Sequence, residues 1–386
     1  MYVTRPRSLY KRDPEALLHP APEGPYSGYL VLQDDEEEED ETHTCLRNFP
    51  FPQNRKLSVL YPESSRNGAT VYKDGVMFIP ALNQPLSSNH YYVIHGKGTH
   101  QGEASTSSND KDMGTCFCCN YIKDVKPRPL NPSDEYQRFE IVKKRWGFQA
   151  NSVAPNGFPP LFLRRSWTLS TKTPQHYHLS EALGIDHSLR HHLPPFTLPS
   201  SQSDHSEAMV IGKWYCPFMF VKEEGMSLKK QMKKSVFYEM TFERRWDKVF
   251  SKENSEKSNE VLVDTVVKTQ VAEMDGGREA VWEKGRIGDE RVTWFKSLEG
   301  GERRVALSKA IVERMRWEGG RSDWVGRNNK EMRVKRVEKI KGMKKGKWRN
   351  FGLYVLVESF MLKRMDESFV LTHDFRYSNH VKCTWE

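Results

Sequence analysis

The sequence has no run of apolar residues long enough to cross a bilayer. A membrane-spanning helix needs about 20 consecutive apolar residues, whereas the longest apolar runs here, such as residues 76–82, have the length of a strand. The opening Met-Tyr-Val-Thr-Arg-Pro-Arg is basic but has no apolar segment behind it, so we do not expect a secretory signal. We therefore expect a cytoplasmic or nuclear protein with no transmembrane segment.

Cysteine is scarce, with six residues spaced unevenly over 386, so we expect free thiols rather than a disulfide framework. Cys116, Cys118 and Cys119 form the one cluster, and His95 and His100 upstream complete a set large enough for tetrahedral zinc. The spacing differs from a zinc knuckle, because adjacent cysteines on an extended chain point to opposite faces. Alternatives to free thiols are zinc binding, redox sensing or S-acylation.

Recognisable catalytic signatures are also missing. No Gly-x-Ser-x-Gly elbow occurs, and no glycine-rich segment is followed by the Lys-Ser or Lys-Thr of a phosphate loop. Five histidines lie between residues 176 and 192, yet the metalloprotease pattern His-Glu-x-x-His is not among them. We expect no cofactor, and an enzyme of unrecognised type stays an alternative.

Aromatic residues are plentiful, with 10 Trp, 15 Tyr and 19 Phe, and they supply the material for folded cores despite a mean hydropathy of −0.75. A chain of 386 residues is long for one core. We therefore expect two globular domains with irregular segments between their strands.

Positive charge is concentrated near the C-terminus. The formal net charge is +9, and residues 303–349 alone hold 17 basic and 5 acidic residues. Cations attract phosphates and aromatic faces stack on bases, so the stretch 314–349 could bind nucleic acid or anionic lipid. The alternative is the solvated face of a sheet. The candidate residues for an anionic partner are Arg333, Lys335, Arg336, Lys341, Lys344, Lys345, Lys347, Trp348 and Arg349.

The chain pattern predicts an α+β, β-rich fold of two domains. Residues 1–27 are proline-rich and predict an extended arm, residues 28–193 a β-rich domain with short helices, and residues 194–208 a linker. Residues 209–386 predict an antiparallel meander, either an open sheet or barrel-like, because glycine pairs and Asp366-Glu367 separate strand-like segments.

Particular segments carry this prediction. Valine or threonine occupies every second position over residues 261–271, which predicts one strand with a single wet face. Further strands are predicted at 57–61, 76–80, 90–95, 280–286, 291–297, 305–317, 332–339, 352–365 and 368–375. Residues 34–41 are all acidic and predict a solvated loop, as does the polar segment 97–115. Asp186 is placed to cap a short helix.

Several motifs resemble those of a plant-specific family of unknown function. They are Met-Tyr-Val-Thr-Arg at residues 1–5, Phe-Pro-Phe-Pro-Gln-Asn at 49–54, Gly-Lys-Trp-Tyr-Cys-Pro-Phe at 212–218 and the tail at 351–386. The resemblance implies a plant origin and extends over nearly the whole chain, but it lends no catalytic residue. Some members carry the label "insecticidal crystal toxin", a chemistry that no residue here indicates. The hypothesis is a non-enzymatic intracellular binding or scaffold protein.

Overall fold

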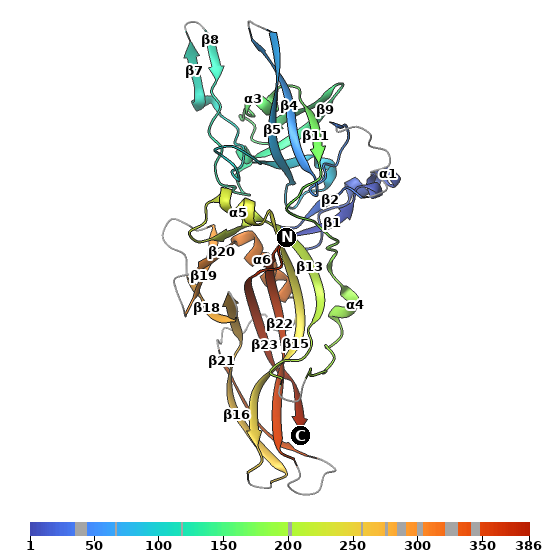
Figure 1. The fold of residues 1–386 in the computed structure, drawn as a ribbon, viewed down its shortest axis with the longest axis vertical. Helices are drawn as coiled ribbons and strands as arrows, with labels where there is room; N and C mark the ends of the chain where they lie inside the picture. Colours follow the sequence, from blue (N-terminus) through green and yellow to red (C-terminus); the bar gives the residue numbers. More distant parts are fainter. Residues whose placement is uncertain are drawn as a thin grey trace. The chain divides into compact units, whose positions relative to one another are not determined.

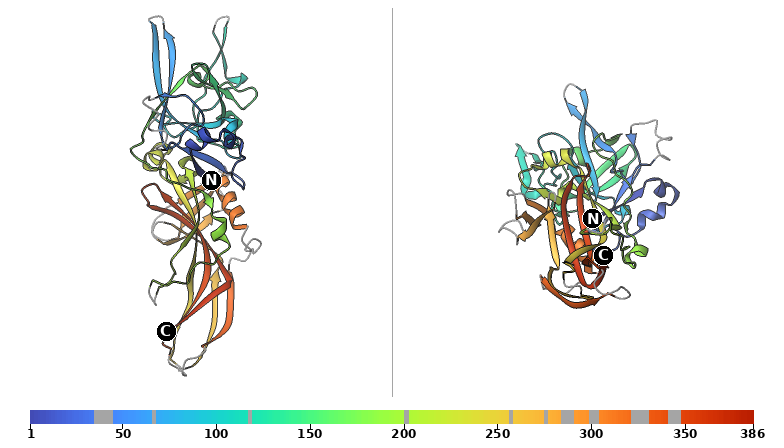
Figure 2. Two further views of the ribbon diagram at one scale, coloured as in Figure 1. Left: turned by 90° about the vertical axis from the view of Figure 1, so that its right-hand side faces the viewer. Right: turned by 60° about the horizontal axis from the view of Figure 1, so that its bottom comes forward.

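A computed structural model describes residues 1–34, 45–65, 68–116, 119–199, 203–255, 258–274, 277–283, 291–298, 304–320, 331–340 and 348–386 (Figures 1 and 2). The chain forms two compact units. Unit 1 contains residues 1–183, 214–238 and 307–314, and unit 2 contains residues 184–213, 239–306 and 315–386. The protein is mostly β, with 51% strand and 15% helix, as the sequence predicts.

Unit 1 is built on an antiparallel sheet of seven strands. Its order is β10 (Gly147–Ser152), β9 (Arg138–Lys144), β6 (His90–His95), β5 (Gly68–Pro80), β4 (Lys56–Ser65), β11 (Thr168–Lys172) and β3 (Cys45–Leu46). The strands predicted at 57–61, 76–80 and 90–95 are confirmed in β4, β5 and β6. Alternate residues of these strands surround the fully buried Phe51, whose ring lies 4.9 Å from that of Phe78 and 5.0 Å from that of Phe148.

The first residues are more ordered than an extended arm. They form β1 (Tyr2–Pro6), α1 (Ser8–Arg12) and the 3-10 helix η1 (Pro14–Leu18), and β1 pairs in parallel with β2 (Gly28–Leu32). Pro6 ends its strand and Pro14 begins its helix, where a missing N–H removes no ladder bond. Gly28 lies opposite Tyr2, and a Cβ there would come within 2.6 Å of the Tyr2 ring.

The remaining elements of unit 1 are short. Among the described residues they are η2 (Leu86–Ser88), η3 (Asp110–Asp112), β7 (Met113–Cys116), β8 (Cys119–Ile122), η4 (Glu135–Gln137), α3 (Leu161–Arg164), η5 (Phe218–Phe220), β14 (Val221–Glu223) and α5 (Leu228–Lys234).

The segment predicted as an exposed loop at 97–115 is exposed at both ends but buried over residues 104–108, which corrects the middle of that prediction. Its Ser105 and Ser108 are fully buried, and their small side chains let the backbone approach neighbouring segments. Ala104 exchanges backbone hydrogen bonds with Arg128 at 2.8 and 3.1 Å. Residues 104–108 therefore form a buried layer of chain within unit 1.

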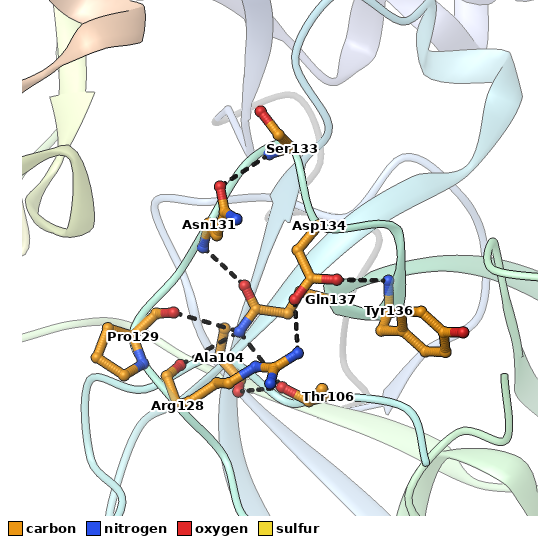
Figure 3. Close-up of polar contacts among 9 residues, drawn as sticks. All are labelled: Ala104, Thr106, Arg128, Pro129, Asn131, Ser133, Asp134, Tyr136 and Gln137. Carbon is orange, nitrogen blue, oxygen red and sulfur yellow. Dashed lines mark hydrogen bonds and ion pairs between the residues drawn. The ribbon is translucent and has the colours of Figure 1, made fainter. Parts of the chain in front are cut away.

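Gln137 holds this layer together (Figure 3). Its side-chain oxygen accepts a hydrogen bond from the Asn131 N–H at 2.7 Å, and its amide nitrogen lies 3.3 Å from both the Thr106 hydroxyl and the Pro129 carbonyl oxygen. Because Gln137 is fully buried, water cannot take its place as the hydrogen-bond partner of these groups.

Replacing Gln137 with Leu should lower the free energy of unfolding by about 2 kcal/mol, because a buried donor and acceptors lose their partner. Urea denaturation of the two proteins measures this loss. Gln149→Leu, at a half-buried amide, is the control and should cost less. Equal losses in the two variants would contradict the structural role of the Gln137 contacts.

Unit 2 contains a broad antiparallel sheet. Its strands run in the order β20 (Arg304–Ser308), β19 (Val292–Ser297), β18 (Arg278–Glu283), β17 (Gln270–Met274), β23 (Phe369–Trp385), β22 (Asn350–Arg364), β15 (Phe237–Glu253) and β13 (Met209–Pro217), with β12 (Gly184–Ile185) on β13. The predicted meander is confirmed as an open sheet. Glu367 has a φ of 62° at the tight turn between β22 and β23.

A two-stranded ribbon of β16 (Glu260–Lys268) and β21 (Glu331–Lys339) also belongs to unit 2. Val261, Val263 and Val267 are buried against Phe351 and Leu353 of β22, which confirms the predicted alternation. The strand predicted over 261–271 is nevertheless two strands, because β16 ends at Lys268 and β17 continues in the other sheet.

The strand predicted at 305–317 is wrong beyond its first residues. β20 ends at Ser308 and α6 (Lys309–Gly320) follows. Ile311, Met315 and Glu318 are buried at a spacing of four and three residues, which is the period of a helix. The short helix predicted after Asp186 is confirmed as α4 (His187–Arg190), which Asp186 caps.

Buried ion pairs lie in the sheet of unit 2. Arg244 of β15 donates to one carboxylate oxygen of Glu358 at 2.8 and 2.5 Å, and the other oxygen accepts from Tyr377 at 2.5 Å. A second pair joins Arg245 to Asp374 at 2.5 Å. Charges in such surroundings are stable only with their partners, so these groups serve the fold.

Candidate functional site

The basic stretch predicted as a site for an anionic partner lies partly on β21. Arg333 is bonded to both carboxylate oxygens of Asp264 at 2.6 Å, and the Arg336 guanidinium lies 2.5 Å from Glu338. Pairing with Arg333 lowers the pKa of Asp264, so the carboxylate stays charged. Lys335 is exposed on the same strand. Carboxylates thus offset part of the positive charge, and the role of these residues stays a prediction.

The other candidates of this stretch are divided between core and surface. Trp348 is 3% exposed, its indole N–H donates to the Ser258 carbonyl, and its ring meets that of Trp385 at 5.2 Å. It therefore has no free face for a nucleic acid base, whereas Arg349 is exposed. Lys341, Lys344, Lys345 and Lys347 lie outside the described residues.

The cysteine cluster lies on the hairpin of β7 and β8, where Cys116 and Cys119 are partners in the backbone register. Cys118 lies outside the described residues, as does the acidic run from residue 35 on. Of the histidines considered with them, His100 Nδ1 lies 2.6 Å from Glu103 Oε2. Within the described part of the chain, no three His, Cys, Asp or Glu side chains are grouped for a metal ion.

A serine and a histidine come together in unit 1 without a sequence motif. Ser105 Oγ lies 3.0 Å from His95 Nε2, and burial lowers the pKa of His95. This contact resembles the nucleophile and base of a hydrolase. Ser105 is fully buried, however, so a substrate cannot reach its hydroxyl, and we assign the pair to the fold.

The candidate site is a cavity of about 620 Å³ that lies within unit 1. Its walls come from segments far apart in the sequence: the start of β4, the middle of β5, the loop after β6, the segment after β11, and α5. Its described lining consists of Arg55, Lys56, Leu57, Ser58, Gly75, Val76, Met77, Gly96, Lys97, Gln101, His176, Tyr177, Met232, Lys233 and Val236.

Two glycines shape one side of the cavity. The Gly96 N–H donates to the Gly75 carbonyl at 2.7 Å, and a Cβ on Gly96 would lie 3.1 Å from that carbonyl oxygen. The following residue, Lys97, extends its side chain past Gly75, with Cγ 3.5 Å from the place of a Cβ there. Its ammonium donates to the carbonyl of Lys73. Close strand approach thus positions this cation at the cavity.

Helix α5 supplies the facing wall. Ser227 caps its first turn by accepting a hydrogen bond from the Lys230 N–H at 3.3 Å. Gln231 is fully buried and donates to the Val221 carbonyl at 2.6 Å, which fixes the helix against its own unit. Met232 and Lys233, the next two residues, then contribute an apolar and a charged side chain to the lining.

The segment after β11 completes the site. The Tyr177 hydroxyl donates to the Gln53 carbonyl at 3.1 Å, and its ring lies 5.6 Å from that of Phe237. Burial raises the pKa of Tyr177 well above its ordinary value, so the phenol is neutral. The Arg55 guanidinium donates to the Thr173 hydroxyl, which holds this side chain at the edge of β4.

The charges around the cavity have one sign. Its described lining includes Arg55, Lys56, Lys97 and Lys233 and no Asp or Glu, while Leu57, Val76 and Met232 give it an apolar floor. Cations converging on a cleft raise the local concentration of anions. An imidazole, from His176, and a hydroxyl, from Ser58, also belong to the lining.

Sequence reasoning missed this site because its parts are separated by up to 181 positions, from Arg55 to Val236. The basic lining residues come from three separate places, Arg55-Lys56, Lys97 and the lysine-rich helix α5, and no motif links them. One local signal was available, since Arg55 directly precedes β4 and Lys97 follows β6 after Gly96. Only the fold brings them together.

Comparisons with known proteins found a family match over part of the chain and similar solved structures. Residues 23–120 match the family described as "Protein of unknown function (DUF1262)". No curated protein matches the chain. A solved structure, "Crystal structure of Cry35Ab1", is similar at 11% sequence identity over 87% of this chain and 90% of that chain, with a TM-score of 0.44. Among the described residues no helix is long and apolar enough to span a membrane. The chain therefore contains a segment similar to a family of unknown function, within a mostly β structure.

Proposed function

We propose that the protein is a non-enzymatic binding protein whose ligand is a small organic anion with an apolar body. The cavity of unit 1 supports this proposal, because all its charged lining residues are basic and its floor is apolar. A carboxylate, sulfate or phosphate group would lie near Lys97 and Lys233. The apolar part would cover Leu57, Val76 and Met232.

The size of the cavity agrees with a ligand of this class. Pockets for small molecules commonly have volumes of about 300–1,000 Å³ and combine apolar walls with a few polar groups. Tyr177 adds a flat, neutral ring to the lining. A fully hydrated inorganic ion would leave the apolar floor uncovered, so an amphiphilic anion fits better.

The proposal also includes a plant origin and a cytoplasmic or nuclear location for the protein. The opening and Trp-Tyr-Cys-Pro-Phe motifs support membership of the plant-specific family, and the match over residues 23–120 is compatible with it. Cys45, Cys216 and Cys383 are free thiols, which supports a reducing cytoplasmic or nuclear compartment.

The aromatic sulfonate 8-anilinonaphthalene-1-sulfonate is a suitable probe, because its fluorescence rises in an apolar site. Lys97→Gln together with Lys233→Gln should weaken its affinity about tenfold, since two favourable charge contacts near the surface are lost. Fluorescence titration at neutral pH measures this, and binding should also weaken with salt.

The matched control removes two exposed lysines of the same unit, Lys123→Gln and Lys126→Gln, and should leave the affinity unchanged. Met232→Trp tests the apolar half, because the larger side chain fills part of the cavity and should reduce binding further. Equal affinities for the site and control variants would contradict the proposal.

A further inference from the structure

A basic hairpin tip with an exposed tryptophan lies at the turn between β9 and β10. Trp146 is 77% exposed, although tryptophan is among the side chains that gain most from burial. The Arg145 guanidinium lies over its ring, 5.1 Å from the ring centroid. Trp146 belongs neither to the core of unit 1 nor to the lining of the cavity, so neither explains its exposure.

The base of the hairpin is braced, which keeps the tip in place. Phe148 and Trp167 exchange backbone hydrogen bonds at 2.7 and 2.9 Å. Gly147 has a φ of +144°, and a Cβ there would lie 2.1 Å from the Trp167 carbonyl oxygen, so a larger residue cannot occupy this position. The turn residues Arg145 and Trp146 therefore project from an ordered base.

Positive charge surrounds the tip. Lys143, Lys144 and Arg145 precede Trp146 and are exposed, and Lys143 Nζ donates to the Asn48 side chain at 2.6 Å. That contact brings the exposed Arg47 to the neighbourhood. In the described part of the chain, Glu140 is the acid on β9, and its carboxylate accepts from the Asn151 side chain at 3.3 Å. The tip is thus a cationic surface around one apolar ring.

We propose that this hairpin tip, defined as residues 143–146, docks the protein on the surface of an anionic lipid bilayer. Lys and Arg side chains near such a surface gain from its negative potential. Tryptophan favours the boundary between head groups and acyl chains because one end of its ring is apolar and the other polar. A small convex tip fits a broad planar surface.

Nucleic acid is the other anionic macromolecule, and the tip fits it less well. Proteins that bind single strands combine a basic groove with successive stacking aromatics. Trp146 is the one aromatic residue of the hairpin tip, which projects rather than forming a groove. The proposal goes beyond ligand binding in the cavity and rests on different residues.

Cosedimentation of the full chain with vesicles tests the proposal. Binding to vesicles of phosphatidylcholine with 30 mol% phosphatidylserine should exceed binding to phosphatidylcholine alone by at least about tenfold. Lys144→Gln with Arg145→Gln should lower the partition coefficient about 25-fold, at roughly fivefold per cation. Trp146→Ala should lower it about tenfold, because the buried ring area is lost.

Matched variants separate the tip from general surface effects. Leu18→Ser removes a different exposed apolar side chain, which is 67% exposed. Lys123→Gln with Lys126→Gln removes two exposed lysines outside the tip. Both variants should bind vesicles like the original protein. Brominated acyl chains should quench part of the tryptophan fluorescence in the original protein and less in Trp146→Phe.

Four outcomes of the binding experiments would overturn the proposal, and a fifth concerns the oligomeric state. They are no binding to anionic vesicles, equal binding to both vesicle types, equal losses in tip and control variants, and tip-dependent binding of a single-stranded oligonucleotide without vesicle binding. The last result would assign the tip to nucleic acid. A Trp146-dependent dimer that does not bind vesicles would equally overturn it, by assigning the ring to a second copy of the chain.

Discussion

Replacing Glu358 with Leu should lower the free energy of unfolding of unit 2 by about 3–5 kcal/mol, because Arg244 would stay buried without its carboxylate. Glu358 is 1% exposed, and both nitrogens that Arg244 directs at it are within 2.8 Å. Arg244 also donates to the carbonyls of Arg190 and His192, so it cannot turn toward solvent without breaking further bonds. Denaturant unfolding followed by circular dichroism measures the loss.

A double variant shows whether the loss of stability comes from an unpaired buried charge or from lost side-chain packing. Arg244→Met with Glu358→Leu removes both charges and should be more stable than Glu358→Leu alone. Lys268→Gln breaks an exposed pair with Glu279 and should cost less than about 1 kcal/mol. A loss below about 1 kcal/mol in Glu358→Leu would show that the carboxylate is dispensable.

Acid should destabilise unit 2 through His373. This side chain is buried beside the rings of Phe295 and Phe375, and burial lowers its pKa to about 4. The neighbouring Asp374 opposes this shift and Arg316 adds to it. The unfolded chain takes up the proton near pH 6.5, whereas the folded chain takes it up only near pH 4. The free energy of unfolding therefore falls as the pH is lowered between these values.

His373→Phe isolates this contribution. Between pH 6.5 and pH 4, the free energy of unfolding of the original protein should fall by on the order of 3 kcal/mol more than that of the variant. The reason is that His373 takes up a proton when the original protein unfolds, whereas the variant has no imidazole at this position. Measuring the urea midpoint at half-unit intervals of pH gives both slopes. His90 and His95, whose pKa values burial also lowers, remain in both proteins and cancel. Parallel slopes would contradict a buried neutral His373.

Local patterns explain why most strands could be predicted. Val261, Val263 and Val267 alternate with polar neighbours, and this period of two belongs to the strand itself. Asp186 likewise predicts its helix, because the capping carboxylate accepts hydrogen bonds from backbone N–H groups only two and three positions later. Such features need no knowledge of the rest of the chain.

Long-range features were beyond such patterns. Ser105 and Ser108 lie in a segment with the composition of a loop, yet both are fully buried and donate backbone hydrogen bonds to Val93 and Phe158. The segment 305–317 mixes β-branched and helix-favouring residues, so either structure was compatible with its pattern until packing decided. The cavity could not be predicted, because Lys97 and Lys233 approach it only through the fold.

Calorimetric titration with two ligands that share an apolar chain but differ in head group tests whether the cavity of unit 1 selects an amphiphilic anion. Octyl sulfate and octyl glucoside, both below their micelle concentrations, are a suitable pair. The sulfate should bind unit 1 once per chain and at least about tenfold more tightly than the glucoside. Lys97→Gln with Lys233→Gln should remove the difference. Equal affinity for both compounds, or no binding of either, would contradict an amphiphilic anion as the ligand.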